Sequence, residues 1–393
     1  MTEQAKVPAI RFAGFTDPWE QRKFSNLTDR VSMQSSDPDL PQVEYEDIVS
    51  GEGTLNKDLR DKEGGKTGIK FYAGDVLYGK LRPYLMNWLY PQFNGVAVGD
   101  FWVLRATECD SSFLYRLVQT DSFQRLANVS SGSKMPRADW NLISQSFFAV
   151  PADYAEQRVI AKSLAELDDL ITLHQRKYDK LVIFKKSMLE KMFPKDGESV
   201  PEIRFAGFTD PWEQRKFSDM YEVNNERNTD CELGYDRTLS IATMTFNGGN
   251  GAADDSLNSY KVIRVGDIAF EGHANKVHAY GRFVLNDAGD GLMSPRFSCL
   301  RPIVEQRYSF WKYYIPHEET MRPILVKATK SGTMMNELVP DDLMRESILA
   351  PCLAEQEAIG DCLSQLDSLI TLHQRKLELL QNIKKSLLDK MFV

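Results

Sequence analysis

The sequence predicts an α+β protein in which two mixed α/β domains are joined by two long antiparallel coiled-coil helices, with a pseudo-two-fold internal repeat. Three observations lead to this prediction. A short entry motif occurs twice, a long helical segment occurs twice, and the two intervening bodies share only short matching islands. A large internal repeat constrains an architecture more strongly than any local propensity does.

The entry motif is almost identical in its two copies. It reads VPAIRFAGFTDPWEQRKFS at 7–25 and VPEIRFAGFTDPWEQRKFS at 200–218, so 18 of 19 positions agree. Each copy carries a tryptophan, Trp19 or Trp212, in the context Asp-Pro-Trp. Because a large aromatic ring contributes most when it is buried, we expect each tryptophan to anchor its entry segment against a helix as part of the core.

The two helical segments, 155–193 and 354–392, align without gaps and have 23 identities in 39 positions. Residues recur at alternating spacings of three and four, which is the pattern of a coiled-coil seam. Pro194 ends the first helix. The seam positions are Leu164, Leu167, Ile171, His174, Tyr178, Leu181, Lys185, Met188 and Met192 in the first copy, and Leu363, Leu366, Ile370, His373, Leu377, Leu380, Lys384, Leu387 and Met391 in the second.

Direct repeats that pack on each other do so most simply about a pseudo-two-fold axis, which makes the helices antiparallel. Such a frame puts one body at each end of the helix pair. The matched polar seam residues, His174 with His373 and Lys185 with Lys384, are expected to fix the helix register rather than to hold a metal.

The bodies at 26–154 and 219–353 are predicted to be α+β. Residues 75–81, 96–104, 261–270 and 281–285 are expected strands, and residues 113–126 and 308–314 are expected helices. The matching islands are 74–76 with 266–268, 101–105 with 297–301, 131–133 with 331–333, and Pro151 with Pro351. The predicted domains are 1–154, the helix 155–193, a linker with the second body at 194–353, and the helix 354–393.

Composition excludes several classes of protein. No stretch is apolar enough for a membrane span, so we expect a cytoplasmic protein without membrane contact. The five cysteines form no C-x-x-C pair, which argues against a zinc site. The net charge of −8 argues only partly against nucleic acid, because 48 basic residues suffice for a local basic stripe. We find no motif of a metalloprotease, a serine hydrolase, a complete nucleotide P-loop or an adenine methyltransferase.

Across essentially the whole chain, this pattern resembles the specificity subunits of Type I restriction enzymes. The residues that carry the resemblance are GFTDPWEQRKFS at 14–25 and 207–218, GDVLYGKLRPY at 74–84 with GDIAFEG at 266–272, the proline-to-EQ junctions at 151–157 and 351–356, and LITLHQRK at 170–177 and 369–376. The resemblance implies two target-recognition domains that together read a bipartite double-stranded DNA target with an unspecified spacer.

The resemblance also implies partners that perform the chemistry. These are two DNA-methyltransferase subunits that use S-adenosylmethionine and two ATP-driven restriction subunits, so S-adenosylmethionine, ATP and Mg²⁺ are expected on the partners. The chain itself is expected to be non-catalytic and to bind no cofactor or metal. The junctions between bodies and helices would dock the methyltransferases.

Candidate DNA contacts lie just after a predicted strand in the first body, in a polar run of the second body, and in a Ser-Gly step that recurs in both bodies. Cations, aromatic rings, amides and hydroxyls there suit phosphate and base contact, whereas the alternatives are solvated strand ends, polar loops and plain turns. The candidates are Lys80, Arg82, Tyr84, Ser131, Ser133, Lys134 and Arg137 in the first body, and Asn275, Lys276, His278, Arg282, Lys330, Ser331 and Thr333 in the second.

Two other functions compete with this one. A self-contained DNA methyltransferase or nuclease would need a catalytic motif that the sequence does not show. A coiled-coil scaffold that does not bind DNA would explain the helices but not the divergence of the two bodies.

Overall fold

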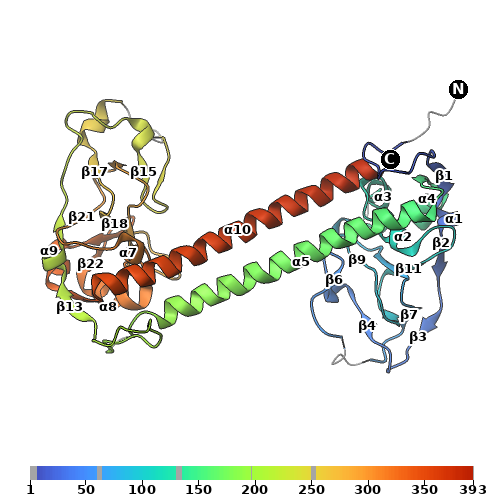
Figure 1. Ribbon diagram of the computed structural model, residues 1–393, viewed down its shortest axis with the longest axis horizontal. Helices are drawn as coiled ribbons and strands as arrows, with labels where there is room; N and C mark the ends of the chain where they lie inside the picture. The colour runs from blue at the N-terminus through green and yellow to red at the C-terminus, as the bar shows by residue number, and fades with distance from the viewer. Residues whose placement is uncertain (1–6, 60–63, 130–134, 196, 249–253, 393) are drawn as a thin grey trace. The chain divides into compact units, whose positions relative to one another are not determined.

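The structure, a computed structural model, describes residues 7–59, 64–129, 135–195, 197–248 and 254–392 (Figure 1). It divides into two units, Met1–Arg176 with Gln374–Val393, and Lys177–His373. The division falls within the two long helices, α5 (Tyr154–Lys191) and α10 (Leu353–Met391). Each unit therefore contains one body and part of each helix.

The body of unit 1 is built on a four-stranded antiparallel sheet in the order β2-β11-β8-β9. A second sheet has the order β3-β7-β10-β4, and β1 pairs with β12. The strands are β1 (Glu20–Lys23), β2 (Thr28–Val31), β3 (Gln34–Ser35), β4 (Gln42–Val43), β5 (Ile48–Val49), β6 (Thr54–Leu55), β7 (Gly68–Phe71), β8 (Val76–Gly79), β9 (Trp88–Leu89), β10 (Gly95–Ala97), β11 (Phe101–Ala106) and β12 (Phe147–Val150). The helices are α1 (Phe24–Leu27), α2 (Ser111–Leu117), α3 (Asp121–Ala127) and α4 (Trp140–Gln145), with 3-10 turns η1 (Tyr45–Asp47) and η2 (Pro83–Leu85).

The body of unit 2 repeats this plan, with a sheet in the order β14-β21-β18-β19 and the pair β13-β24. The repeat is therefore one of topology as well as of sequence. The strands are β13 (Glu213–Lys216), β14 (Tyr221–Val223), β15 (Leu239–Ser240), β16 (Thr245–Phe246), β17 (Lys261–Ile263), β18 (Ile268–Glu271), β19 (Arg282–Leu285), β20 (Gly291–Met293), β21 (Cys299–Pro302), β22 (Thr329–Ser331), β23 (Asn336–Leu338) and β24 (Ser347–Ala350). The helices are α6 (Phe217–Met220), α7 (Tyr308–Tyr314), α8 (Glu318–Ala328) and α9 (Pro340–Arg345), with η3 (Tyr235–Arg237) and η4 (Asp254–Ser259).

Three runs that the sequence predicts as single elements are interrupted in the structure. The strand predicted at 96–104 is two strands, β10 and β11, because Gly99 turns the chain at φ +103°. The run 261–270 is likewise split between β17 and β18, with Gly266 at φ +92°. The helix predicted at 113–126 is broken into α2 and α3, since the side chain of Thr120 caps α3 by accepting a hydrogen bond from the N–H of Phe123.

Both entry-motif tryptophans lie in the core, as predicted. Trp19 is 5% exposed and packs edge-on against Phe113 and Phe392. Trp212 is 3% exposed and packs in the same way against Phe310 and Tyr314. In each unit the end of one long helix also bonds the entry segment, since the N–H of Ile10 donates to the carbonyl of Lys390 at 3.0 Å and that of Ile203 donates to the carbonyl of Lys191 at 2.9 Å.

The predicted seam is also confirmed, because every seam position is buried or half-buried. In unit 1, Lys384 forms an ion pair with Asp168 at 2.7 Å. In unit 2, Lys185 forms the matching pair with Asp367 at 2.5 Å. Early residues of one helix therefore face late residues of the other within each unit, so the helices run antiparallel (Figure 1). The two seam histidines are half-buried.

No described helix is long and apolar enough to span a membrane. In the same described ranges, no group of three or more His, Cys, Asp or Glu side chains could hold a metal ion.

Acidification is expected to destabilise unit 2 through His317. Burial lowers the pKa of this residue below its ordinary value, despite the nearby carboxylates of Glu319 and Glu318. The ring packs against Phe193 and its Nδ1 bonds the Thr320 hydroxyl at 2.9 Å. Because the unfolded chain takes up the proton at a higher pH than the folded one, the free energy of unfolding should fall as pH drops from about 7 to about 5. Urea unfolding across this range should show a shallower loss for His317→Gln, and equal slopes for the two proteins would contradict the prediction.

Candidate nucleic-acid interface

The entry segment of each body is fastened to the start of a long helix by a buried ion pair. In unit 1, Arg11 donates from Nε and Nη2 to the two carboxylate oxygens of Glu156 at 2.6 and 2.7 Å. In unit 2, Arg204 makes the same two bonds to Glu355 at 2.6 and 2.7 Å. The carboxylates are 2% and 0% exposed. Two parallel charge-assisted bonds fix direction as well as distance, so this pair orients each body on its helix.

Hydrogen bonds at the proline-to-EQ junction also join each body to its helix. The side-chain amide of Gln157 donates to the carbonyl of Pro151 at 2.7 Å, and that of Gln356 donates to the carbonyl of Pro351 at 2.9 Å. Both glutamines are buried. The exit strand of each body is thereby tied to the first turn of the helix that follows it.

Two of the matching sequence islands meet inside each body. Asp75 accepts two bonds from Arg105 at 2.8 and 2.7 Å, and Asp267 accepts two from Arg301 at 3.0 and 2.9 Å. Each aspartate also accepts a backbone N–H from three residues before it, which closes the turn into β8 or β18. These islands therefore fix the strand that leads into the candidate DNA-contacting loop.

In unit 1 the structure brings together the predicted Lys80, Arg82, Tyr84 and Arg137. Backbone bonds join the loop after β8 to residues 136–138, including a bridge between Leu81 and Arg137. Arg82 has a left-handed φ of +50°, which is uncommon outside glycine, and Tyr84 is 54% exposed. Strained backbone of this kind concentrates at functional sites.

Asp100 lies between the cations of this loop and was not expected from the sequence. Its carboxylate pairs with Lys80 at 3.5 Å and Arg137 at 2.9 Å, and its carbonyl accepts the hydroxyl of Tyr45. Burial alone would raise the pKa of Asp100, but the hydrogen bond and charge of Arg137, with those of Lys80, lower it overall. The Gly-Asp step at 99–100 is the sequence signal that marks this turn.

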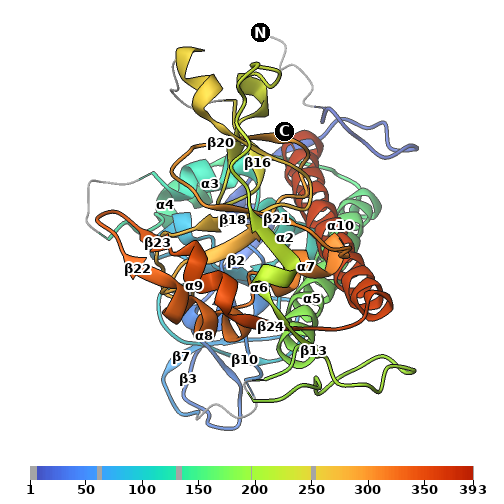
Figure 2. The same ribbon diagram turned by 90° about the vertical axis from the view of Figure 1, so that its left-hand side faces the viewer.

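Unit 2 places its candidate residues in the equivalent arrangement. The loop after β18 carries exposed Asn275 and Lys276, and it lies against the β22–β23 hairpin, where the N–H of Asn336 donates to the carbonyl of Gly272 at 2.9 Å. Figure 2 shows this hairpin beside α8 and α9. Its exposed residues include the predicted Lys330, Ser331 and Thr333.

Some predicted residues already have partners within the protein. The side-chain oxygen of Asn275 accepts the N–H groups of Val277 and His278 at 2.8 and 2.9 Å. His278 is 15% exposed at its side chain and pairs with Glu318 at 2.9 Å. Lys330 pairs with Glu337 at 3.4 Å.

The remaining predicted residues are Arg282 in unit 2 and Ser131, Ser133 and Lys134 in the first body. Arg282 donates from Nη2 to the carbonyl of Ala242 at 2.8 Å. The predicted Ser131, Ser133 and Lys134 lie outside the described residues.

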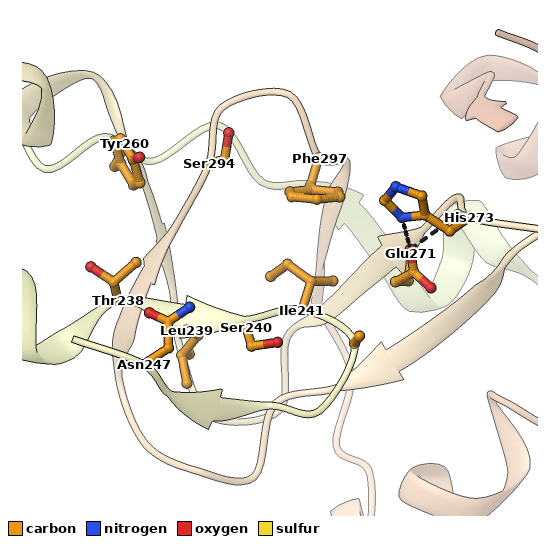
Figure 3. A pocket seen from close by; sticks show the side chains of 11 residues that line it. Thr238, Leu239, Ser240, Ile241, Asn247, Tyr260, Glu271, His273, Ser294 and Phe297 are labelled. Carbon is orange, nitrogen blue, oxygen red and sulfur yellow. Dashed lines mark hydrogen bonds and ion pairs between the residues drawn. The ribbon is translucent and has the colours of Figure 1, made fainter. Parts of the chain in front are cut away.

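A cavity next to the unit 2 loop was also missed by the sequence analysis. It encloses about 320 Å³ and is reached by Glu271 and His273, which flank Gly272 (Figure 3). His273 Nδ1 lies 2.5 Å from Glu271 Oε1. The nearest sequence signal was the run of polar residues at 273–278, which gave no indication of a cavity.

The comparisons with known proteins agree with this architecture. No family model matches the chain. It is 24% identical over 301 residues to the Type I restriction enzyme MjaVIII specificity subunit of Methanocaldococcus jannaschii, covering 71% of this chain and 68% of that protein. It is 27% identical over 155 residues to the EcoDI specificity subunit of Escherichia coli, covering 38% of this chain and 34% of that protein.

Two solved structures have a similar fold. The S subunit of a Type I restriction-modification system from M. genitalium has a TM-score of 0.53 at 13% identity, with 99% of each chain covered. The second is a chain from a type I R-M system whose structure was described for its complex assembly and conformational transition. It has a TM-score of 0.51 at 17% identity, with 95% of this chain and 97% of that chain covered. The predicted fold class is confirmed. The chain is therefore a relative of the Type I restriction enzyme specificity subunits, and it shares their fold.

Proposed function

We propose that the chain is the DNA-specificity subunit of a Type I restriction-modification complex. The observation that carries this proposal is that the two units have the same scaffold, with loops of different sequence after the equivalent strands. The pairs Arg11–Glu156 and Asp75–Arg105 recur as Arg204–Glu355 and Asp267–Arg301, whereas the loops after β8 and β18 differ in sequence. Each unit reads one half of a bipartite double-stranded DNA target.

The chemistry of the complex belongs to partner subunits. Methyltransferase subunits that use S-adenosylmethionine dock at the junctions between bodies and helices, and restriction subunits supply ATP- and Mg²⁺-dependent cleavage. The relatives' names and the occurrence of the same junction in both units support this division of labour. The specificity chain acts in the cytoplasm and contributes recognition but no catalytic group.

Loss of one cation from the proposed DNA face should flatten the salt dependence of binding. Each phosphate contact contributes about one unit to the slope of log affinity against log salt. Lys80→Ala, Arg82→Ala and Lys276→Ala, measured on random-sequence duplex with the methyltransferase subunits present, should each weaken binding and lower the slope by about one unit. A cation that contacts a base instead should relax one target position by roughly 1–3 kcal/mol.

The control is Lys162→Ala, which removes an exposed α5 lysine that pairs with Glu166 at 3.9 Å. It should leave both affinity and slope unchanged. If the three loop variants behave like this control, the DNA face lies elsewhere on the units.

A further inference from the structure

The cavity of unit 2 has the size and lining of a nucleobase site. Its volume of about 320 Å³ is at the lower end of the roughly 300–1,000 Å³ typical of small-molecule pockets. Phe297 and Ile241 provide apolar walls, and Ser240 and Ser294 provide hydroxyls (Figure 3). Such a mixture accommodates a flat ring with polar edges better than it accommodates an aliphatic group.

Glu271 supplies the charge of this cavity. It is the last residue of β18, and its side chain is only 9% exposed. One carboxylate oxygen, Oε1, accepts the N–H of His273 at 3.0 Å and lies 2.5 Å from the imidazole Nδ1. Within the described ranges, His273 is the one side chain that pairs with the carboxylate of Glu271. The carboxylate is therefore held in place through Oε1, and Glu271 is one of the residues that line the cavity.

The equivalent position in unit 1 cannot hold such a group. Glu271 aligns with Gly79 in the matched segments GDIAFEG and GDVLYGK. A Cβ at Gly79 would lie 2.8 Å from the ring of Tyr45 and 3.0 Å from the backbone oxygen of Asn87, so the space is filled by unit 1 itself. The two units therefore match along the equivalent strands β8 and β18 up to this residue. Their sequences differ from the point at which the candidate DNA-contacting loop begins.

We propose that Glu271 determines specificity by accepting a hydrogen bond from the exocyclic amino group of a cytosine in the half-site read by unit 2. This inference rests on the proposed function. A carboxylate accepts from cytosine N4 but repels the carbonyl oxygens of guanine and thymine, and the N7 acceptor of adenine disfavours that base as well. His273 acts as a positioning residue that fixes the carboxylate. The neighbouring Asn275 and Lys276 lie on the same loop and hold the backbone of the same half-site.

The test is the base preference of Glu271→Gln. The complex with methyltransferase subunits is assayed on a duplex library in which each position of the wild-type target is varied. Glutamine also offers donors and pairs with the N6 and N7 atoms of adenine, so one C·G position should lose roughly ten- to a hundredfold preference and accept A·T. Glu222→Gln, at an exposed carboxylate of the same sheet, is the matched control and should keep the wild-type preferences.

Unchanged preference for the unit 1 half-site shows that the variant is folded. Glu271→Asp, which keeps the charge but shortens its reach, should weaken the cytosine preference without changing its identity. Wild-type protein without any bipartite preference would refute the proposed function itself. If the target is bipartite but its unit 2 half-site lacks a C·G pair, only the inference about Glu271 is wrong. The same holds if Glu271→Gln has the same base preferences in that half-site as the wild-type protein.

A further comparison tells how the amino group reaches the carboxylate. An abasic site opposite the critical cytosine lowers the cost of extruding that base. Tighter binding to this duplex, abolished by Glu271→Gln, shows that the base enters the cavity. Equal binding shows that the base is read within the groove, and the role of Glu271 then rests on the base preference of Glu271→Gln alone.

Discussion

Replacing Arg11 with methionine is expected to lower the free energy of unfolding of unit 1 by about 3–5 kcal/mol. Methionine fills similar space but leaves the carboxylate of Glu156, which is 2% exposed, without the guanidinium that holds both of its oxygens. The indole of Trp19 still donates to Glu156 at 3.3 Å, and one neutral donor does not replace a bidentate cation. Urea unfolding of the purified chain, followed by tryptophan fluorescence, measures the loss.

A matched control lies in the same motif. Arg22→Met removes a half-exposed arginine that pairs with Glu20 and Glu108, and it should cost no more than about 1 kcal/mol. Arg204→Met should reproduce the large loss in unit 2, because the pair with Glu355 has the same geometry. Equal, small effects of all three substitutions would show that the ion pair does not anchor the body.

The frame could be predicted from sequence because its signals are local or repeated. The seam follows from spacing alone, and its polar members Lys185 and Lys384 stand out within an apolar stripe. Their partners, Asp367 and Asp168, could not be predicted in the same way, since each lies on the other helix and the pairing depends on the antiparallel register.

The candidate site was predicted only in outline. The loops after β8 and β18 were identified by their cations and aromatic rings, but the carboxylates that accompany them were not. Asp100 reaches Lys80 across 20 residues of sequence, and Glu318 reaches His278 across 40. Such contacts arise from tertiary packing between strands and helices, which no periodicity within one segment encodes. The cavity at Glu271 depends on four separate segments of unit 2 and has the same explanation.

The largest functional effect is expected from replacing residues 26–154 with the chain's own second body, residues 219–353. Both halves of the target should then be the half-site that the second body reads. Each mismatched base pair costs about 1–3 kcal/mol, so the original target should be bound on the order of a hundredfold more weakly or worse. The exchange keeps the entry motif, whose strand β1 pairs with β12 as β13 pairs with β24. Methylome sequencing of cells that contain this chain and its methyltransferase gives the new target directly.

One residue of the receiving helix must change with the body. Ala161 of α5 aligns with Gly360 of α10, and a Cβ at Gly360 would lie 2.4 Å from the hydroxyl of Ser309 and 2.6 Å from the backbone nitrogen of Phe310. The neighbouring core contacts are compatible, since Ile160 and Leu164 match Ile359 and Leu363. The exchanged chain should therefore fold well only with Ala161→Gly, and without it the transplanted body should be destabilised because the clash involves backbone. If the exchanged chain with Ala161→Gly is folded and active but still methylates the original asymmetric target, the bodies do not carry the specificity.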